Sequence, residues 1–205
     1  MAREEERLTR AQEEPIVGGL PDVPGIGAAI RLTPGLGVHL RGLADELLVH
    51  DFPGATISRV EREMIATAVS AANDCFFCMD SHAAHATALL EAGESAELTS
   101  LLDEIKMGSS DGLDEKMRAL LHIARTVRRQ PRDLTSADVA AATNAGAADA
   151  DVQLAVLIAA AFSMYNRMVD GFRAKTPPSA DAYRARAEEI AEHGYSGQPV
   201  PSGPR

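Results

Sequence analysis

Two cysteines, a histidine and a glutamate stand at spacings that could support thiol chemistry. They form the series Glu63-x11-Cys75-x2-Cys78-x3-His82, and the chain has no other cysteine. Two cysteines three positions apart at the start of a helix lie on one face, close enough to form a disulfide. Cys78 and His82 are four positions apart, so their thiol and imidazole can share a hydrogen bond. This pattern is typical of a redox-active dithiol with an acid–base partner.

Glu63 stands three helical turns before the cysteines, on a stretch whose neighbours are apolar. A short turn between two helices returns such a residue to the start of the second helix. A partly buried carboxylate beside a histidine orients the imidazole ring and holds a proton in reserve. We therefore expect Glu63 to meet His82 in space.

Thiolate formation alone is too small an effect to account for this arrangement. An ordinary thiol with a pKa of ~8.5 is about 3% ionised at pH 7, and a decrease of two pKa units gives roughly 75%. A thiolate of lower pKa is about 8-fold less nucleophilic, so the rate of attack increases only about threefold. Proton delivery to a leaving oxygen or sulfur adds roughly 10²–10⁴-fold. We expect Glu63 and His82 to supply that proton.

The elements that position these residues are predicted to be helices. Apolar residues make up 45% of the chain, aromatic residues only 4%, and tryptophan is absent. Such a core consists of Ala, Leu, Val, Ile and Met, which suit packed helices better than strands. Ser58 and Glu61 have the spacing of a capping box at the start of one helix. Apolar periodicity predicts helices at 38–50, 58–73, 75–90, 95–106, 114–128, 136–142, 149–171 and 180–193.

A chain of 205 residues and 21.7 kDa corresponds to one domain. We predict a charged N-terminal tail at 1–14, a single-domain helical bundle at 15–193, and a flexible, Gly- and Pro-rich C-terminal tail at 194–205. Prolines and glycines predict loops and turns at 15–37. A faint similarity between residues 63–82 and 153–172 is compatible with a degenerate helix-pair repeat, although two Ala-rich helices also resemble each other by coincidence.

Charge and apolar patterning exclude several classes of partner. The net charge of −10 repels polyphosphates, so no nucleic-acid partner is expected. Residues 1–14 contain no apolar stretch of a secretory signal, and the most apolar run, 154–162, is too short for a membrane span. We predict a cytoplasmic protein without membrane contact, in which a close cysteine pair is redox-active or metal-binding. No Gly-rich phosphate loop follows a strand, so no cofactor is expected.

The string EREMIATAVSAANDCFFCMDSH resembles the alkylhydroperoxidase D-like, carboxymuconolactone decarboxylase-related superfamily in its peroxidase-related branch. The Pro-rich lead-in and the later string AAAFSMYNRMVDGF resemble the same branch, so the likeness covers most of residues 20–190. The resemblance implies an all-α fold of that type. It also implies a homo-oligomer, as a trimer, dimer or hexamer.

The same resemblance implies a thiol-dependent (alkyl)hydroperoxide reductase with peroxiredoxin-type activity. In the family the second cysteine attacks the peroxide and the first resolves it as a disulfide, roles that fall here on Cys78 and Cys75. The histidine and glutamate form a proton relay through water, which corresponds to His82 and Glu63. A hydroperoxide is then the substrate, and an external dithiol the reductant. The best-understood members carry a second histidine before the second cysteine, where this chain has Phe77.

Two other interpretations of the same residues remain open. Cys75, Cys78, His82 and His85 could supply four zinc ligands in a zinc-stabilised or non-catalytic helical module. All four lie within one turn and helix, whereas structural zinc normally joins two separated segments. A carboxymuconolactone decarboxylase-like enzyme on the same fold is the other alternative, although members associated with that chemistry generally lack the cysteine pair.

Arg167 and Asp170, three positions apart, are expected to form a structural ion pair.

Overall fold

Helices are the only regular structure in the residues that the computed structural model describes, which are 2–11, 13–90, 95–177 and 179–197. This confirms the all-α class. The α-helices are α1 (Ala2–Ala11), α2 (Ile26–Leu32), α3 (Pro34–Leu48), α4 (Arg59–Ala72), α5 (Phe76–Ala88), α6 (Ser95–Lys106), α7 (Glu115–Arg129), α8 (Ser136–Asn144), α9 (Asp149–Gly171) and α10 (Arg184–His193). Two short 3₁₀ helices are η1 (Pro131–Asp133) and η2 (Ala180–Tyr183).

The start of α4 is fixed by the predicted capping box. The Ser58 side chain accepts a hydrogen bond from the Glu61 amide, and the Glu61 carboxylate accepts one from the Ser58 amide at 2.7 Å. Each partner satisfies a backbone donor that would otherwise be unpaired at the helix start. The position of this cap sets where Glu63 lies on α4.

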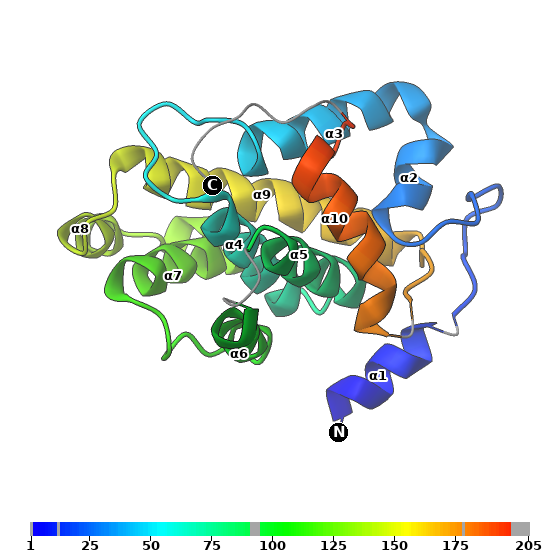
Figure 1. Cartoon of the computed structure of the whole chain (residues 1–205), viewed down its shortest axis with the longest axis horizontal. Coiled ribbons are helices and arrows are strands. Elements are labelled where there is room, and N and C mark those ends of the chain that lie inside the picture. The colour runs from blue at the N-terminus through cyan, green and yellow to red at the C-terminus, as the bar shows by residue number, and fades with distance from the viewer. Residues whose placement is uncertain (1, 12, 91–94, 178, 198–205) are drawn as a thin grey trace.

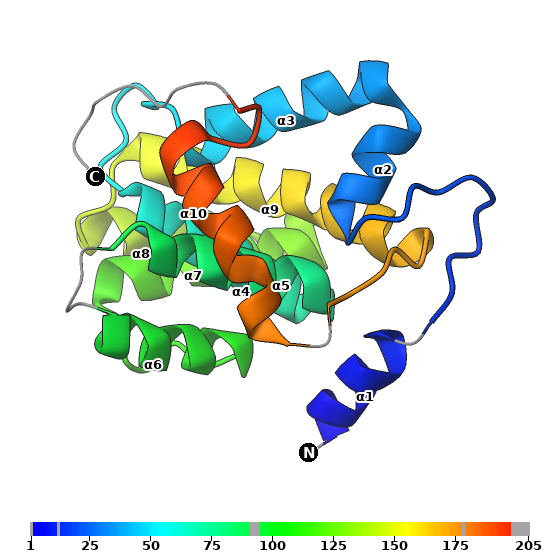
Figure 2. The same cartoon turned by 45° about the vertical axis from the view of Figure 1, so that its right-hand side comes forward.

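Helix α9 runs through the middle of the bundle, with α3 along one side and α4 and α7 packed against it (Figure 1). The α4 and α5 helices form an antiparallel pair, and α10 crosses over α5 (Figure 2). The main core is aliphatic, as the composition predicts. Its completely buried side chains include Leu48, Ile65, Leu120, Leu121, Ile123, Leu154 and Ile158.

The segment 15–37 differs from its prediction as loop and turns. Residues Ile26–Leu32 form α2, whose Ala28, Ala29 and Ile30 are buried. The preceding Gly25 has a φ of 56°, and Pro34 occupies the first turn of α3, where its missing amide hydrogen is tolerated. Gly25 and Pro34 thus stand at the starts of α2 and α3. Glycines and prolines in this segment therefore do not exclude a helix between them.

Helix α9 is one continuous element, so residues 153–172 do not form a second helix pair. Among the described residues, it is also the one helix long and apolar enough to span a membrane by length and composition. The apolar run counted in the sequence, 154–162, is shorter than this helix. However, 56% of the most apolar 18-residue window of α9 is buried in the protein, as in a core helix.

Both predicted tails contain ordered contacts. In the charged segment 1–14, residues 2–11 form α1 at the edge of the molecule, where Arg7 pairs with Asp80 at the start of α5. The 194–205 segment was predicted to be flexible, but Tyr195 and Ser196 both bond Asp45 through their backbone amides, at 2.6 and 3.0 Å. A buried carboxylate thus holds Tyr195 and Ser196. Residues 198–205 of the predicted flexible tail lie outside the described part.

Candidate active site

A break between α4 and α5 places both cysteines. Asp74 adopts the left-handed conformation, with a φ of 54°, and Cys75 is the N-cap of α5. Its amide donates to the carbonyl of Ser70 at 3.0 Å, and its own carbonyl accepts from Met79. Cys78 consequently lies in the first turn of α5.

Polar side chains from two other helices hold this break in place. Asn73 donates to Asn166 of α9 at 2.8 Å and accepts from Arg128 of α7 at 2.7 Å. Asn166 in turn donates to Ser70 at 3.1 Å, and Arg128 also bonds the carbonyl of Ala72. The last carbonyls of α4 are thereby satisfied, which stabilises the abrupt end of the helix.

The two thiols are free, buried and surrounded by apolar side chains. The surrounding residues are Leu20, Val23, Ile26, Ala28, Phe77, Val169 and Ala174. A hydrogen bond with Cys78, burial and the charge of Asp170 raise the pKa of Cys75 well above its usual value. Cys75 is therefore held as a protonated thiol beside Cys78.

The predicted ion pair between Arg167 and Asp170 is not formed. Arg167 donates instead to the carbonyl of Ser163, at 2.8 Å. The Asp170 carboxylate lies 3.8 Å from the Arg10 guanidinium and contacts the Cys75 thiol. Burial raises the pKa of Asp170, and this is partly offset by Arg10 and Cys75.

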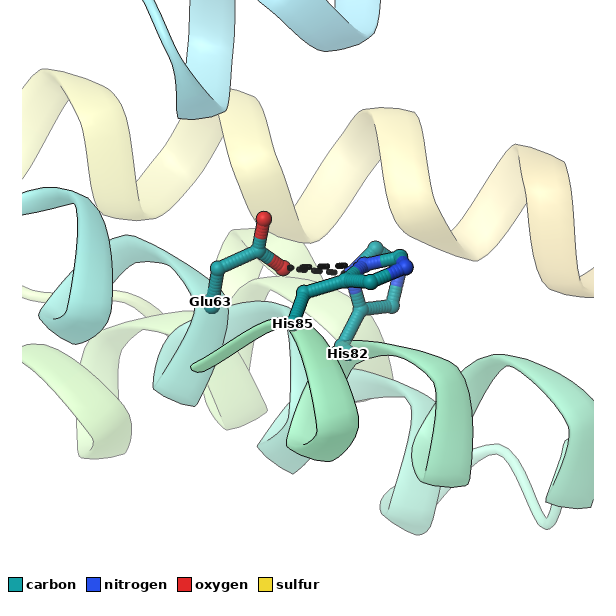
Figure 3. A group of neighbouring side chains, drawn as sticks. All are labelled: Glu63, His82 and His85. Atoms are coloured by element: carbon teal, nitrogen blue, oxygen red, sulfur yellow. Dashed lines mark hydrogen bonds and ion pairs between the residues drawn. The ribbon is translucent and has the colours of Figure 1, made fainter. Parts of the chain in front are cut away.

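Glu63 and His82 meet as expected, and His85 joins them (Figure 3). His82 Nδ1 lies 2.7 Å from Glu63 Oε2, and His85 Nδ1 lies 3.8 Å from the same oxygen. Only 1% of Glu63 and 4% of His82 is exposed. The pair thus forms in a dry environment, where its hydrogen bond is stronger than in water.

The histidines keep Glu63 ionised despite its burial. Burial alone would raise the pKa of Glu63, but its contacts with His82 and His85 lower that pKa to about 2. Burial lowers the pKa of His85, although Glu63 opposes this effect. Glu63 is therefore a fixed negative charge at neutral pH, and His85 is favoured in its neutral form.

Tyr195 is a third partner of Glu63 that the sequence did not indicate. Its hydroxyl donates to Glu63 Oε1 at 2.6 Å, and its oxygen lies 2.9 Å from His85 Nδ1. Because Tyr195 has a single hydroxyl proton, which points to Glu63, its oxygen accepts from His85. Tyr195 lies in a Gly- and Pro-rich segment, 194–205, in which it is the only aromatic residue of the sequence. That isolated aromatic residue was the one sequence feature that could have indicated its role.

The expected hydrogen bond between Cys78 and His82 is absent from the described part of the chain. His82 directs Nδ1 to Glu63, and its ring packs edge-to-face on Phe162 with centroids 4.5 Å apart. An imidazole that donates through Nδ1 retains a lone pair on Nε2.

Glu63, His82 and His85 could also hold a metal ion, since their ligand atoms all lie within 4.8 Å of one another. Two histidines and one carboxylate suit zinc. The structure thus groups the histidines with Glu63 and not with the cysteines, unlike the four-ligand set considered from the sequence. Both Glu63 oxygens already accept hydrogen bonds, so the three side chains satisfy one another without an ion.

Comparison with known proteins supports the same fold. The family model of the carboxymuconolactone decarboxylase family matches residues 43–101, which include Glu63, both cysteines and His82. A comparison with curated proteins finds no match. The chain is similar to the structure described as an alkylhydroperoxidase AhpD core, an uncharacterized peroxidase-related protein from Ralstonia eutropha JMP134. That similarity has a TM-score of 0.65 and 24% identity, and covers 92% of this chain and 90% of the other.

A second similar structure is an uncharacterized peroxidase-related protein from Silicibacter sp. TM1040. Its TM-score is 0.64 at 23% identity, over 84% of this chain and 93% of that one. At identities this low, the two similar structures show the fold alone. Together with the family match, they confirm the resemblance to the alkylhydroperoxidase D-like superfamily.

Proposed function

From a chain with the alkylhydroperoxidase D-like fold and a carboxymuconolactone decarboxylase family segment, we propose a thiol-dependent reductase of organic hydroperoxides. The observation that carries the proposal is the 2.7 Å hydrogen bond between Glu63 and His82, one helical turn from a buried dithiol. It fixes the orientation of a proton carrier on the same helix as the proposed nucleophile.

Cys78 is the nucleophile of the proposed reaction. His82 accepts the thiol proton at Nε2, while Glu63 stabilises the imidazolium through Nδ1. The Cys78 sulfur attacks the terminal oxygen of R–O–O–H, so an S–O bond forms and the O–O bond breaks. The sulfur is oxidised to a sulfenic acid, the peroxide is reduced, and the proton from His82 passes to the leaving alkoxide to give R–OH.

Cys75 completes the cycle as the resolving thiol. It attacks the sulfenic acid, which releases water and forms the Cys75–Cys78 disulfide, and an external dithiol reduces that disulfide. The raised pKa of Cys75 supports this division of roles, because a protonated thiol is a poor competitor for the peroxide.

Anaerobic stopped-flow with tert-butyl hydroperoxide tests the proposal. The reduced protein should consume one equivalent of peroxide and lose two titratable thiols. Cys78→Ser should abolish the reaction. Cys75→Ser should still consume peroxide but stop at a sulfenic acid that dimedone traps. The opposite behaviour of the two variants would reverse the roles, and no consumption by the parent protein would refute the function.

Zinc binding is the competing role that a specific observation supports, namely the grouping of Glu63, His82 and His85. Metal analysis of protein purified without chelator distinguishes the two. Stoichiometric zinc together with unreactive thiols would contradict the peroxidase proposal. Zinc that binds only when added, and that slows peroxide consumption, would agree with a relay blocked by a competing ion.

We further propose that the protein works in the cytoplasm as a homo-oligomer. Apolar side chains remain exposed along α3 and α9, among them Leu36, Val38, Leu43, Leu157 and Met164. Burial of such residues between copies is a usual source of association energy. Size-exclusion chromatography with light scattering measures the assembly; a monomer at micromolar concentration would refute it.

A further inference from the structure

Tyr183, the last residue of η2, carries a buried hydroxyl whose role the proposed cycle does not explain. Only 4% of its side chain is exposed. Within the described ranges its hydroxyl has no hydrogen-bond partner. Native proteins rarely leave a buried hydroxyl unpaired, because its lost hydration is not replaced. A group that costs stability in the free protein is therefore a candidate for binding a ligand.

The surroundings of Tyr183 place it at the dithiol. η2 packs against α5, and the Tyr183 ring lies 5.5 Å from the ring of Phe77, between the two cysteines in the sequence. Burial and the nearby charge of Asp80 raise the pKa of Tyr183, Arg7 opposes them, and Cys78 and Cys75 add smaller increases. The hydroxyl therefore keeps its proton and remains a donor.

Phe77 makes this donor significant. The family histidine that would stand at position 77 is replaced by an apolar ring that cannot donate a hydrogen bond. Gly25 fixes this ring closely, since a Cβ at position 25 would lie 2.1 Å from the Phe77 ring. Tyr183 brings a hydroxyl-bearing ring against Phe77, although it comes from a segment more than 100 residues away.

We propose that the Tyr183 hydroxyl binds the substrate, donating a hydrogen bond to the leaving oxygen of an alkyl hydroperoxide at Cys78. The inference rests on the proposed function and names one more of its residues. When the S–O bond forms and the O–O bond breaks, negative charge develops on the oxygen attached to R. Tyr183 stabilises that charge and keeps its own proton, while the proton carried by His82 converts the alkoxide to the alcohol.

The apolar residues around the thiols guide the choice of a test substrate. Val23, Ile26 and Val169 pack near Cys75 and Cys78 and carry no charge to meet an ionic group. A hydroperoxide with an apolar R group gains burial there, whereas hydrogen peroxide has no such group to bury. Cumene hydroperoxide, whose R group is apolar, is therefore the probe.

Tyr183→Phe is the test, because it removes the hydroxyl and retains the ring. One donor to a developing oxyanion is worth about 10²–10³ in rate, so the second-order rate constant with cumene hydroperoxide should fall by about 10²-fold. Alkylation of the thiols by iodoacetamide develops no oxyanion and should be unchanged. The melting temperature should stay equal or rise, since an unpaired buried hydroxyl is lost.

Tyr165→Phe is the matched control. Its hydroxyl is also buried, but it donates to the carbonyl of Leu40 at 2.8 Å. This variant should melt at a lower temperature and keep the parental peroxide rate. The two substitutions should thus change opposite properties, which a general effect of losing a tyrosine hydroxyl would not produce.

Each alternative result has a distinct meaning. A parental peroxide rate in Tyr183→Phe, or a large loss of stability, would overturn the inference while the peroxidase function stands. A parent protein that consumes neither peroxide would overturn the function itself.

Discussion

The segments 63–82 and 153–172 have similar apolar patterns, yet one contains the candidate site and the other does not. The first is broken at Asp74 and folds back as α4 and α5, so that Glu63 and His82 lie 2.7 Å apart. The second remains within α9 to its C-cap. Its corresponding positions, Gln153 and Phe172, are separated by 19 residues of straight helix, roughly 28 Å at 1.5 Å per residue.

The comparison shows that a helix break, and not sequence spacing alone, assembles the polar cluster. The break also creates a new helix start for Cys78 and turns α5 antiparallel to α4. Helix α9 takes the complementary role: it supplies Asn166, which bonds Asn73 at the break, and Phe162, which packs on the His82 ring. The continuous segment therefore holds the broken one in shape.

The largest expected effect comes from removing the Glu63 charge from the segment 63–82. Glu63→Gln should lower the second-order rate with an organic hydroperoxide by about 10²–10⁴-fold, because the His82 imidazolium loses its counter-charge. The matched control is Gln153→Glu on α9, whose side chain is exposed. It should leave the rate unchanged. Equal rates in the Glu63→Gln variant and the parent would show that the cluster does not move protons.

Acid should lower the free energy of unfolding through the same Glu63 carboxylate. The pKa of Glu63 is about 2 in the folded protein and 4.5 as a free group. Because the folded value is the lower one, its contribution is complete above pH 4.5 and is lost as the pH falls toward 2. That contribution is about 3 kcal/mol.

Urea denaturation at a series of pH values measures this effect. Between pH 5 and pH 2.5, the free energy of unfolding of the parent should fall more steeply than that of Glu63→Gln. Parallel curves would show that Glu63 has no depressed pKa in the folded state.

Loss of the support from α9 should have a smaller effect. Asn166→Ala removes the 2.8 Å acceptor of the Asn73 amide and the donor to the Ser70 hydroxyl, so the free energy of unfolding should fall by about 1–3 kcal/mol. Arg167→Ala, at the exposed neighbouring position, should change it by less than about 0.5 kcal/mol. Equal effects of the two substitutions in chemical denaturation would refute a specific role for Asn166.

The backbone of the break itself should give the smallest change. Asp74 has a φ of 54°, which glycine adopts freely and a β-branched residue does not. Asp74→Val should destabilise the protein by about 1–2 kcal/mol, whereas Asp74→Gly should change stability by less than about 1 kcal/mol. If both variants unfold at the same denaturant concentration, the left-handed turn is not required.

Local signals in the sequence predicted much of the fold. The helices Ser95–Lys106 and Asp149–Gly171 have the predicted bounds, and the capping box at Ser58 is present. Each depends on residues a few positions apart. The meeting of Glu63 and His82 was predicted because a short turn between two helices constrains where their side chains can lie.

Contacts between distant segments could not be predicted in this way. Tyr195 and Asp45 are separated by 150 residues, and the Gly- and Pro-rich composition around Tyr195 is typical of a flexible tail. The unpaired hydroxyl of Tyr183 becomes visible only when every neighbour is placed. The sequence grouped His85 with the cysteines as a possible zinc ligand, since a position on a helix face does not reveal a shared carboxylate.

The contact between Tyr195 and Glu63 has a consequence for biosynthesis. Glu63 and both histidines leave the ribosome more than 100 residues before Tyr195 does. During that interval α4 and α5 can pair, but one oxygen of a carboxylate destined for burial still lacks its donor. The cluster of Glu63, His82 and His85 therefore completes its hydrogen bonds only late in synthesis, after the segment anchored by Asp45 has been made.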